Sequence, residues 1–215
     1  YPIILIHPIG GNIDIWEHEI QFILKKGFRV IAYEIRGHNR SSMGGKRDFT
    51  LYNLSEDLHM LVEELKIKKC TLVGHSIGGA IASLYAKQHL HNVDAIIFIN
   101  SSSKRIPNKD LEKHYTTRKI AISEGMAALA EWNRENNKDA KKTFEDQKTW
   151  NYFKEIFTKT SVEGFVAERE VGDDVALDRR LEQRPLEPGR VAQVATLDAR
   201  LAVESDPGEN IAAET

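Results

Sequence analysis

The chain has 215 residues, of which 41% are apolar and 29% are charged, and its formal net charge is −2. These values indicate a globular protein of one or two domains with enough apolar surface for a core. They exclude a global basic field that would attract nucleic acid or an anionic membrane. No apolar run approaches the roughly 18 residues that a membrane span needs. The single cysteine, Cys70, excludes an internal disulfide and a multi-cysteine metal site, and it fits a reducing, cytoplasmic setting.

Strand and helix patterns alternate over the first hundred residues. Short apolar runs rich in β-branched residues predict buried strands at residues 2–7, 28–35, 70–73 and 94–100. Apolar residues at helical spacing predict intervening helices at residues 15–24, 54–65 and 80–89. The alternation predicts an α/β fold, with a doubly wound, mainly parallel sheet covered by helices on both faces.

The character of the chain changes twice after residue 103. Residues 104–164 contain no strand-like run, and aromatic-rich helical spacing predicts a small helical insertion. The last 51 residues contain none of the 17 lysines and none of the 8 histidines, and they carry 6 basic and 12 acidic side chains. We therefore expect a partial core at residues 1–103, a helical cap at 104–164 and an anomalous, poorly ordered tail at 165–215. Weak helical patterns in that tail lie at residues 175–181 and 191–203.

The segment Gly74-His75-Ser76-Ile77-Gly78 has the pattern G-x-S-x-G. A strand pattern precedes it and an alanine-rich helix pattern follows it, as expected for a nucleophile elbow. In such a turn the serine is held in a strained conformation, and the glycines remove clashes that a Cβ would make. Ser76 would then project above the carboxyl end of the sheet, where open α/β sheets bind ligands. The alternative is a serine in a glycine turn of a nucleotide-binding fold, although the phosphate-binding spacings G-x-G-x-x-G and G-x-x-x-x-G-K do not occur.

Two more motifs follow the first two predicted strands, HPIGGN at residues 7–12 and EIRGHNRS at residues 34–41. Together with the G-x-S-x-G segment, their order and spacing resemble the α/β-hydrolase superfamily over about residues 1–167. The resemblance implies that the backbone N–H groups of Ile9 and Ile77 form an oxyanion hole, since Pro8 has no N–H. A glycine turn with a purely structural role is the alternative for the first loop. The second loop is mainly architectural in this family, and here Asn39 stands at the usual glycine position.

The helical insertion resembles the cap of enol-lactone hydrolases and related hydrolases of small substrates, in the stretches EGMAALAEW (124–132) and TSVEGFVA (160–167). The resemblance implies a small ester or lactone as substrate, under a lid lined by Trp132, Trp150 and Phe153. Alternatively, these aromatic side chains pack the cap onto the core. We expect no metal, no cofactor, no nucleic-acid partner and no membrane partner. His75 is expected to pack beneath the nucleophile, and Cys70 to be a buried, inert thiol.

The catalytic triad that the resemblance implies is incomplete in this sequence. A serine nucleophile needs a general base, and the family supplies its triad in the order Ser, Asp or Glu, His. No histidine follows His114, and the charged run at residues 165–170 before Asp173 and Asp174 is unsuited to the buried strand that would present the acid. We therefore expect a truncated or frame-shifted piece of a serine hydrolase with impaired activity. The alternative is a non-catalytic binding protein or an inactive remnant on the same fold.

Overall fold

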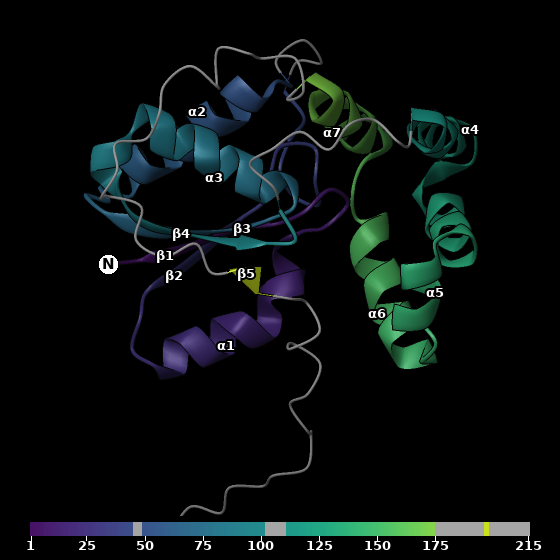
Figure 1. Cartoon of the computed structure of the whole chain (residues 1–215), viewed down its shortest axis with the longest axis horizontal. Helices are drawn as coiled ribbons and strands as arrows, with labels where there is room; N and C mark the ends of the chain where they lie inside the picture. Colours follow the sequence, from purple (N-terminus) through teal and green to yellow (C-terminus); the bar gives the residue numbers. More distant parts are fainter. Residues whose placement is uncertain (45–48, 102–110, 175–195, 198–215) are drawn as a thin grey trace, which may run out of the picture.

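The computed structural model describes residues 1–44, 49–101, 111–174 and 196–197 (Figure 1). These residues form a sheet in the order β2-β1-β3-β4-β5, in which every strand pair is parallel. The strands are β1 (Ile3–Ile6), β2 (Val30–Tyr33), β3 (Cys70–His75), β4 (Val93–Ile99) and β5 (Thr196–Leu197). The predicted α/β class and its parallel sheet are therefore confirmed.

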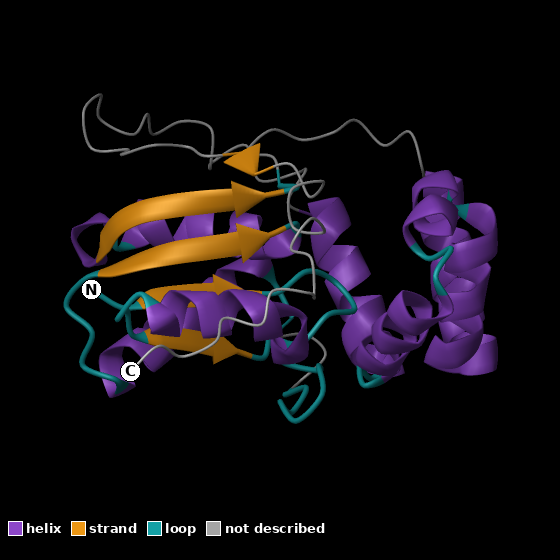
Figure 2. Ribbon diagram, turned by 90° about the horizontal axis from the view of Figure 1, so that it is seen from below, coloured by secondary structure: helices purple, strands orange, loops and turns teal. Residues whose placement is uncertain are grey.

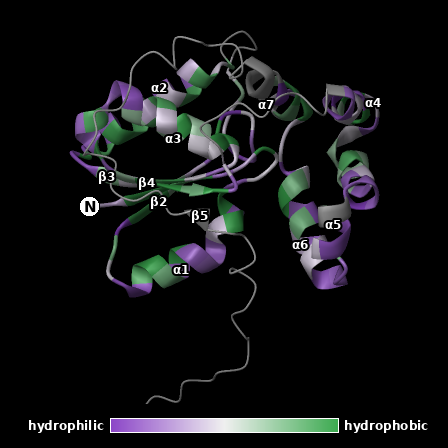
Figure 3. Cartoon of the chain, viewed as in Figure 1, coloured by the Kyte–Doolittle hydropathy of each residue, from purple (hydrophilic) through white to green (hydrophobic). Residues whose placement is uncertain are grey.

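Helices cover both faces of the sheet, as the alternating pattern predicted. The short helix η1 (Ile13–Trp16) and α1 (Glu17–Lys25) lie on one face, while α2 (Leu51–Glu64) and α3 (Ile77–Gln88) lie on the other (Figure 1). A further short helix, η3 (Leu90–Asn92), leads into β4. The strands are coloured as apolar between helices that carry both apolar and polar residues (Figure 3). Burial of this apolar surface from water is the main force that holds such layers together.

The core is largest between the sheet and the helices α2 and α3. It contains fully buried side chains from β1, α2 and α3, among them Ile4, Ile6, Leu58, Ile81 and Tyr85. The opposite face has a smaller cluster formed by Leu5, Trp16 and Val73. Successive residues of β1 thus face different clusters, as the two-residue period of a strand requires.

A bundle of helices lies beyond the carboxyl ends of the strands, where the strand arrowheads point (Figure 2). It consists of α4 (Leu111–Asn136), α5 (Lys138–Thr143), α6 (Gln147–Thr158) and α7 (Val162–Asp174). Helix α4 is kinked at Gly125, whose φ of 85° is outside the helical region. We call this bundle the cap. A third apolar cluster, the cap cluster, holds it together; its buried members are Ala121, Met126, Leu129, Ala130, Trp150, Phe157 and Phe165.

The described part of the tail differs from the sequence prediction at one place. Residues 196 and 197 lie within a predicted weak helix, but they form β5, which pairs with Phe98 and Ile99 at the edge of β4. Tertiary pairing at an open sheet edge overrides a weak local preference. The pattern at 175–181 lies outside the described residues. The division into core, cap and tail stays a prediction, and α7 continues through the proposed boundary after residue 164.

No helix in the described ranges is long and apolar enough to cross a membrane.

Candidate active site

Ser76 occupies a sharp turn between the end of β3 and the start of α3. Its backbone has φ 54° and ψ −117°, a left-handed conformation that is costly for a residue with a Cβ. Hydrogen bonds hold this turn: the Ser76 N–H donates to the Ile99 carbonyl at 3.0 Å, and the Ser101 hydroxyl donates to the Ser76 carbonyl at 2.7 Å. The surrounding structure therefore fixes the strain at Ser76, and a strained residue of this kind is a functional candidate.

The glycines around Ser76 are required by close packing of the backbone. A Cβ on Gly74 would collide with the backbone of Gly78 and Gly79. A Cβ on Gly78 would collide with the carbonyl of Ile6, whose carbon it would approach to 2.9 Å. The G-x-S-x-G pattern thus lets helix α3 start directly against β1 and β3. This is the strand–turn–helix context that the sequence predicted for Ser76.

The strand register brings the loop after β1 close to this turn. Ile6, the last residue of β1, pairs with Gly74 of β3, so the two chain segments leave the sheet side by side. Ile77 is the first residue of α3, and the first N–H groups of a helix have no intrahelical acceptor. Ile9 lies in the loop after β1, where its side chain packs partly buried against both the main core and the cap cluster. The two predicted oxyanion donors therefore follow adjacent strands, Ile9 in the loop after β1 and Ile77 at the start of α3 after β3.

His7 fixes the start of the loop after β1. The side chain is fully buried; its Nδ1 donates to the Pro8 carbonyl at 2.9 Å, and its Nε2 accepts the Ile35 N–H at 2.9 Å. One ring nitrogen thus donates and the other accepts a hydrogen bond, which is the pattern of a neutral imidazole. Burial lowers the pKa of His7 to about 3, with smaller contributions in the same direction from His38 and His75. His7 is thus a neutral cross-link between the loop and the end of β2.

The second predicted loop is packed under the cap. Asn39 adopts φ 44°, which explains why a glycine is usual at its position. Its N–H donates to the Lys159 carbonyl at 3.0 Å, and its side chain hydrogen-bonds to Glu34. Gly37 lies so close to Gly164 of α7 that a Cβ on either residue would meet the backbone of the other. These contacts agree with the architectural role expected for the loop.

His75, expected beneath the nucleophile, and Cys70, expected to be a buried thiol within a strand, differ in their surroundings. His75 is half-buried, its ring meets Trp16 edge-on at a centroid distance of 6.4 Å, and burial lowers its pKa. Cys70 is fully buried at the start of β3, and burial raises the pKa of its thiol to about 11. A protonated thiol in this position is a poor nucleophile.

The three predicted lid residues lie in the cap. Trp150 is 2% exposed and belongs to the cap cluster, and Arg134 lies over its ring at 4.8 Å. Phe153 continues an aromatic row: its ring centroid is 4.4 Å from that of Phe144 and 5.4 Å from that of Phe157. Trp132 packs partly buried against the same cluster. The structure thus brings the three side chains to the same apolar cluster, with Trp150 buried and Trp132 and Phe153 partly buried, and their contact with a substrate stays a prediction.

Among the described residues, no histidine or carboxylate side chain forms a hydrogen bond with the Ser76 hydroxyl. All 8 histidines precede residue 115. Three of them gather away from Ser76, around the end of α3: His59 and His89 stack at 3.9 Å, and the His91 ring lies 6.5 Å from that of His89. Asp173 and Asp174 end helix α7 and do not follow a strand.

Sequence reasoning missed two side chains that organise the site. Asn12 is fully buried, caps η1 through a bond from the Asp14 N–H at 2.8 Å, and donates to the Ile156 carbonyl at 3.3 Å. Its position before a helical pattern is a signal for such a cap. Ser101 supports the Ser76 carbonyl from the end of β4, and no motif in the sequence marks it.

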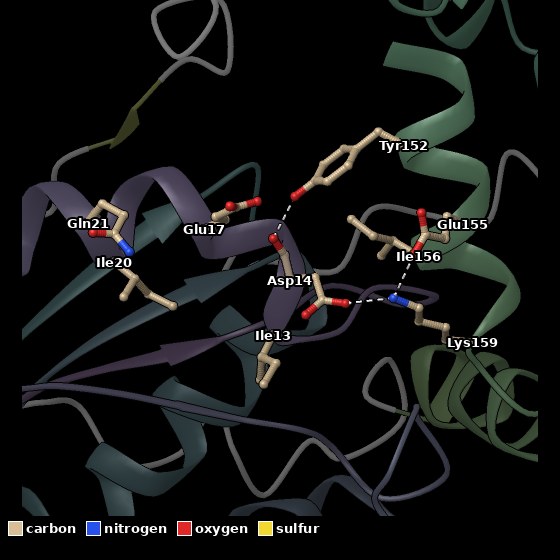
Figure 4. Close-up of a pocket in the computed structure, with 9 residues that line it drawn as sticks. All are labelled: Ile13, Asp14, Glu17, Ile20, Gln21, Tyr152, Glu155, Ile156 and Lys159. Atoms are coloured by element: carbon tan, nitrogen blue, oxygen red, sulfur yellow. Dashed lines mark hydrogen bonds and ion pairs between the residues drawn. The ribbon is translucent and has the colours of Figure 1, made fainter. Parts of the chain in front are cut away.

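One cavity lies between the core and the cap, and Ser76 is not among the residues that line it. Its volume is about 470 Å³, and it separates η1 and α1 from α6 (Figure 4). Tyr152, Glu155 and Lys159 line one wall, and the other wall includes Asp14 and Glu17. A second cavity of about 390 Å³ lies within the cap, beside Arg134 and Lys141.

Comparison with known proteins agrees with this architecture. Residues 1–146 match the family described as the alpha/beta hydrolase fold, and the chain belongs to that family. It is similar to a solved carboxylesterase structure from the thaumarchaeon Nitrososphaera gargenis, with 54% identity and a TM-score of 0.76 over 81% of this chain and 66% of that chain. The enol-lactonase of Burkholderia xenovorans LB400 has 25% identity and a TM-score of 0.70 over 80% of this chain and 64% of that one.

A curated relative is the putative carbamate hydrolase RutD of Variovorax paradoxus, which is 28% identical over 102 residues. The match covers 47% of this chain and 38% of RutD, so the chain spans less than half of that relative. The predicted resemblance to esterase and lactonase members of the superfamily is confirmed by these findings.

Proposed function

We propose that the chain carries the nucleophile, the oxyanion loop and the cap of a serine hydrolase that acts on a small ester or lactone. The observation that carries this proposal is the strained backbone of Ser76 at a strand–helix turn whose glycines admit no Cβ. The resemblance to a carboxylesterase and an enol-lactonase supports the substrate class. No metal or cofactor takes part in the proposed reaction.

In the proposed mechanism, the Ser76 hydroxyl oxygen attacks the substrate carbonyl carbon and loses its proton, which gives a tetrahedral intermediate. Collapse of this intermediate breaks the C–O bond of the ester or lactone, the alcohol oxygen leaves and takes up a proton, and the acyl group remains on Ser76. The Ile9 and Ile77 N–H groups stabilise the oxyanion, and water then releases the acyl group. Loss of a single donor of this kind typically slows catalysis by about 100- to 1000-fold. The dipole at the N-terminus of α3 also favours the negative charge that develops on this oxyanion.

The proposed activity of this polypeptide is impaired. The attack requires a base that takes the Ser76 proton, and the sequence holds no histidine after His114. The oxyanion hole and substrate binding alone leave a residual acceleration of about 10³–10⁴ over water. The lid formed by Trp132, Trp150 and Phe153 would then contribute by excluding water from a small substrate.

The buried thiol of Cys70 is compatible with a cytoplasmic location, which we also propose.

Labelling with a fluorophosphonate tests the nucleophile. We expect slow, stoichiometric modification of Ser76 and none in Ser76→Ala. The matched control is Ser83→Ala on the same helix, which removes a hydroxyl that donates to the Gly79 carbonyl at 2.8 Å. Labelling of the Ser76→Ala variant at the parent rate would contradict the assignment. Rapid labelling of the parent would instead show that a base acts on Ser76.

The second candidate is a non-catalytic binding protein, or an inactive remnant, on the same fold. It is favoured by the lack of a described histidine or carboxylate bonded to the Ser76 hydroxyl. Esterase assays with short-chain aryl esters separate the two. Under this alternative, parent and Ser76→Ala hydrolyse the ester at the same rate, whereas the hydrolase requires the parent to be faster.

A further inference from the structure

An aromatic side chain of the cap contacts the loop after β1, which carries the proposed oxyanion donor Ile9. Gly10 adopts φ 71°, and the ring of Phe157 covers it so closely that a Cβ on Gly10 would lie 2.7 Å from Phe157 Cδ2. The neighbouring Ile9 side chain packs against the cap cluster and the main core together. The end of α6 therefore lies directly on the residues that surround the Ile9 N–H.

Polar contacts also join α6 to Asp14, which lies at the C-terminal end of this loop. The Tyr152 hydroxyl donates to the Asp14 carbonyl at 2.7 Å, and Lys159 Nζ lies 2.9 Å from Asp14 Oδ2 (Figure 4). Lys159 also pairs with Glu155 of its own helix at 3.1 Å. The bond to Asp14, and after it the bond to Glu155, raises the pKa of the Lys159 ammonium group, so Lys159 stays charged over the neutral range.

Asn12 connects the loop after β1 to helix α6. Its side-chain oxygen accepts the Asp14 N–H at 2.8 Å and its amide donates to the Ile156 carbonyl at 3.3 Å, while the residue is fully buried. The Asn12 side chain thus shapes the C-terminal end of the loop, where it enters η1, and binds this end to α6. The N-terminal end of the loop is fixed by the bond from the His7 ring to the Pro8 carbonyl.

We propose that Asn12, Tyr152 and Lys159 are positioning residues that hold the segment 8–14, and with it the Ile9 N–H, against the cap. The inference rests on the proposed function, because an oxyanion donor needs a fixed place before charge develops. A loop with so few residues between its two fixed ends has little freedom once its exit is bound. Release of the α6 contacts would loosen the loop at Gly10 and Gly11, which are joined to the rest of it by a bond from the Gly11 N–H to the Pro8 carbonyl at 2.9 Å.

Hydrogen exchange of the backbone amides tests the proposal without requiring activity. The variant Tyr152→Phe/Lys159→Met removes two contacts between α6 and Asp14, and we expect the amides of residues 9–11 to exchange about five- to tenfold faster. Lys159→Arg in the Tyr152→Phe background should restore most of the protection. The matched control is Lys154→Met, which removes a similarly exposed pair of α6 with Glu131 inside the cap. Equal exchange at residues 9–11 in the double variant and this control would overturn the proposal.

Fluorophosphonate labelling tests whether the position of the loop affects the reactivity of Ser76. The double variant should be labelled at Ser76 about fivefold more slowly than the parent, and Lys154→Met at the parent rate. Asn12→Asp keeps the acceptor that caps η1, but it replaces the donor to the Ile156 carbonyl by a carboxyl oxygen, so its loop should also exchange faster. Faster exchange with unchanged labelling would overturn the positioning role. A parent that is not labelled at all would refute the proposed function, while the exchange result would still decide whether α6 holds the loop.

Discussion

The buried imidazole of His7 makes the stability of this protein depend on pH in a calculable way. Its pKa lies at about 3 in the folded protein against an ordinary value of 6.5, because burial excludes the charged form. Between these two values the unfolded chain binds a proton that the folded chain does not. The free energy of unfolding therefore falls as the pH is lowered from about 6.5 toward 3, and this part of the stability is complete above pH 6.5.

The size of the effect follows from the pKa difference. Each pKa unit corresponds to about 1.4 kcal/mol, so His7 alone should remove about 2 kcal/mol of stability between pH 7 and pH 5. The variant His7→Gln supplies an acceptor for the Ile35 N–H in a group that does not titrate. It removes one of the two donors to the Pro8 carbonyl, which keeps the Gly11 N–H, and this loss should cost about 1 kcal/mol at pH 7. At pH 5 the variant should therefore equal or exceed the parent in stability.

Urea unfolding at several pH values between 5 and 7.5, followed by tryptophan fluorescence, measures this difference. The exposed His18→Gln variant is the control for loss of an imidazole from the surface. Parallel pH profiles for the parent and His7→Gln would refute the reasoning, since they would mean that the pKa of His7 is the same in the folded and the unfolded protein.

Two other predictions concern the turn at Ser76. Ser76→Gly should stabilise the protein by about 1 kcal/mol relative to Ser76→Ala in urea unfolding, because glycine alone accepts φ 54° without strain; equal stability of the two variants would show that the turn is not strained. Gly78→Ala should lower the stability by about 3 kcal/mol or prevent folding, since its Cβ would strike the Ile6 carbonyl. The reverse change at the next alanine of α3, Ala80→Gly, should cost only about 1 kcal/mol in the same assay, and a similar loss at both positions would contradict the packing argument.

The α/β core could be predicted because its signals are local. Each parallel strand is a short apolar run, and each covering helix repeats its apolar residues at helical spacing, so the seven predicted elements of the first hundred residues all have a counterpart. The strand–turn–helix setting of Ser76 was predictable for the same reason, since its glycines adjoin it in sequence. By contrast, β5 depends on an edge of β4 that is far away along the chain.

The contacts between cap and core could not be predicted in this way. The Asn12 amide and the Ile156 carbonyl are separated by 144 residues, and no periodicity within either segment indicates that they meet. The aromatic spacing of the cap predicted helices, but it did not reveal that Phe157 covers Gly10 or that Trp150 is an interior residue. Such pairings depend on how the helices are arranged in space, which single-sequence patterns do not specify.

Helix α7 bears on how the cap of this protein can change in evolution. Phe165 is buried in the cap cluster, and Ala167, only two residues further along the same helix, is buried in the main core. The cap therefore ends on a helix that serves both layers at once. A helical bundle transplanted from a relative would have to bring a compatible α7 with it, because a change in α7 would disturb the main core as well as the cap cluster.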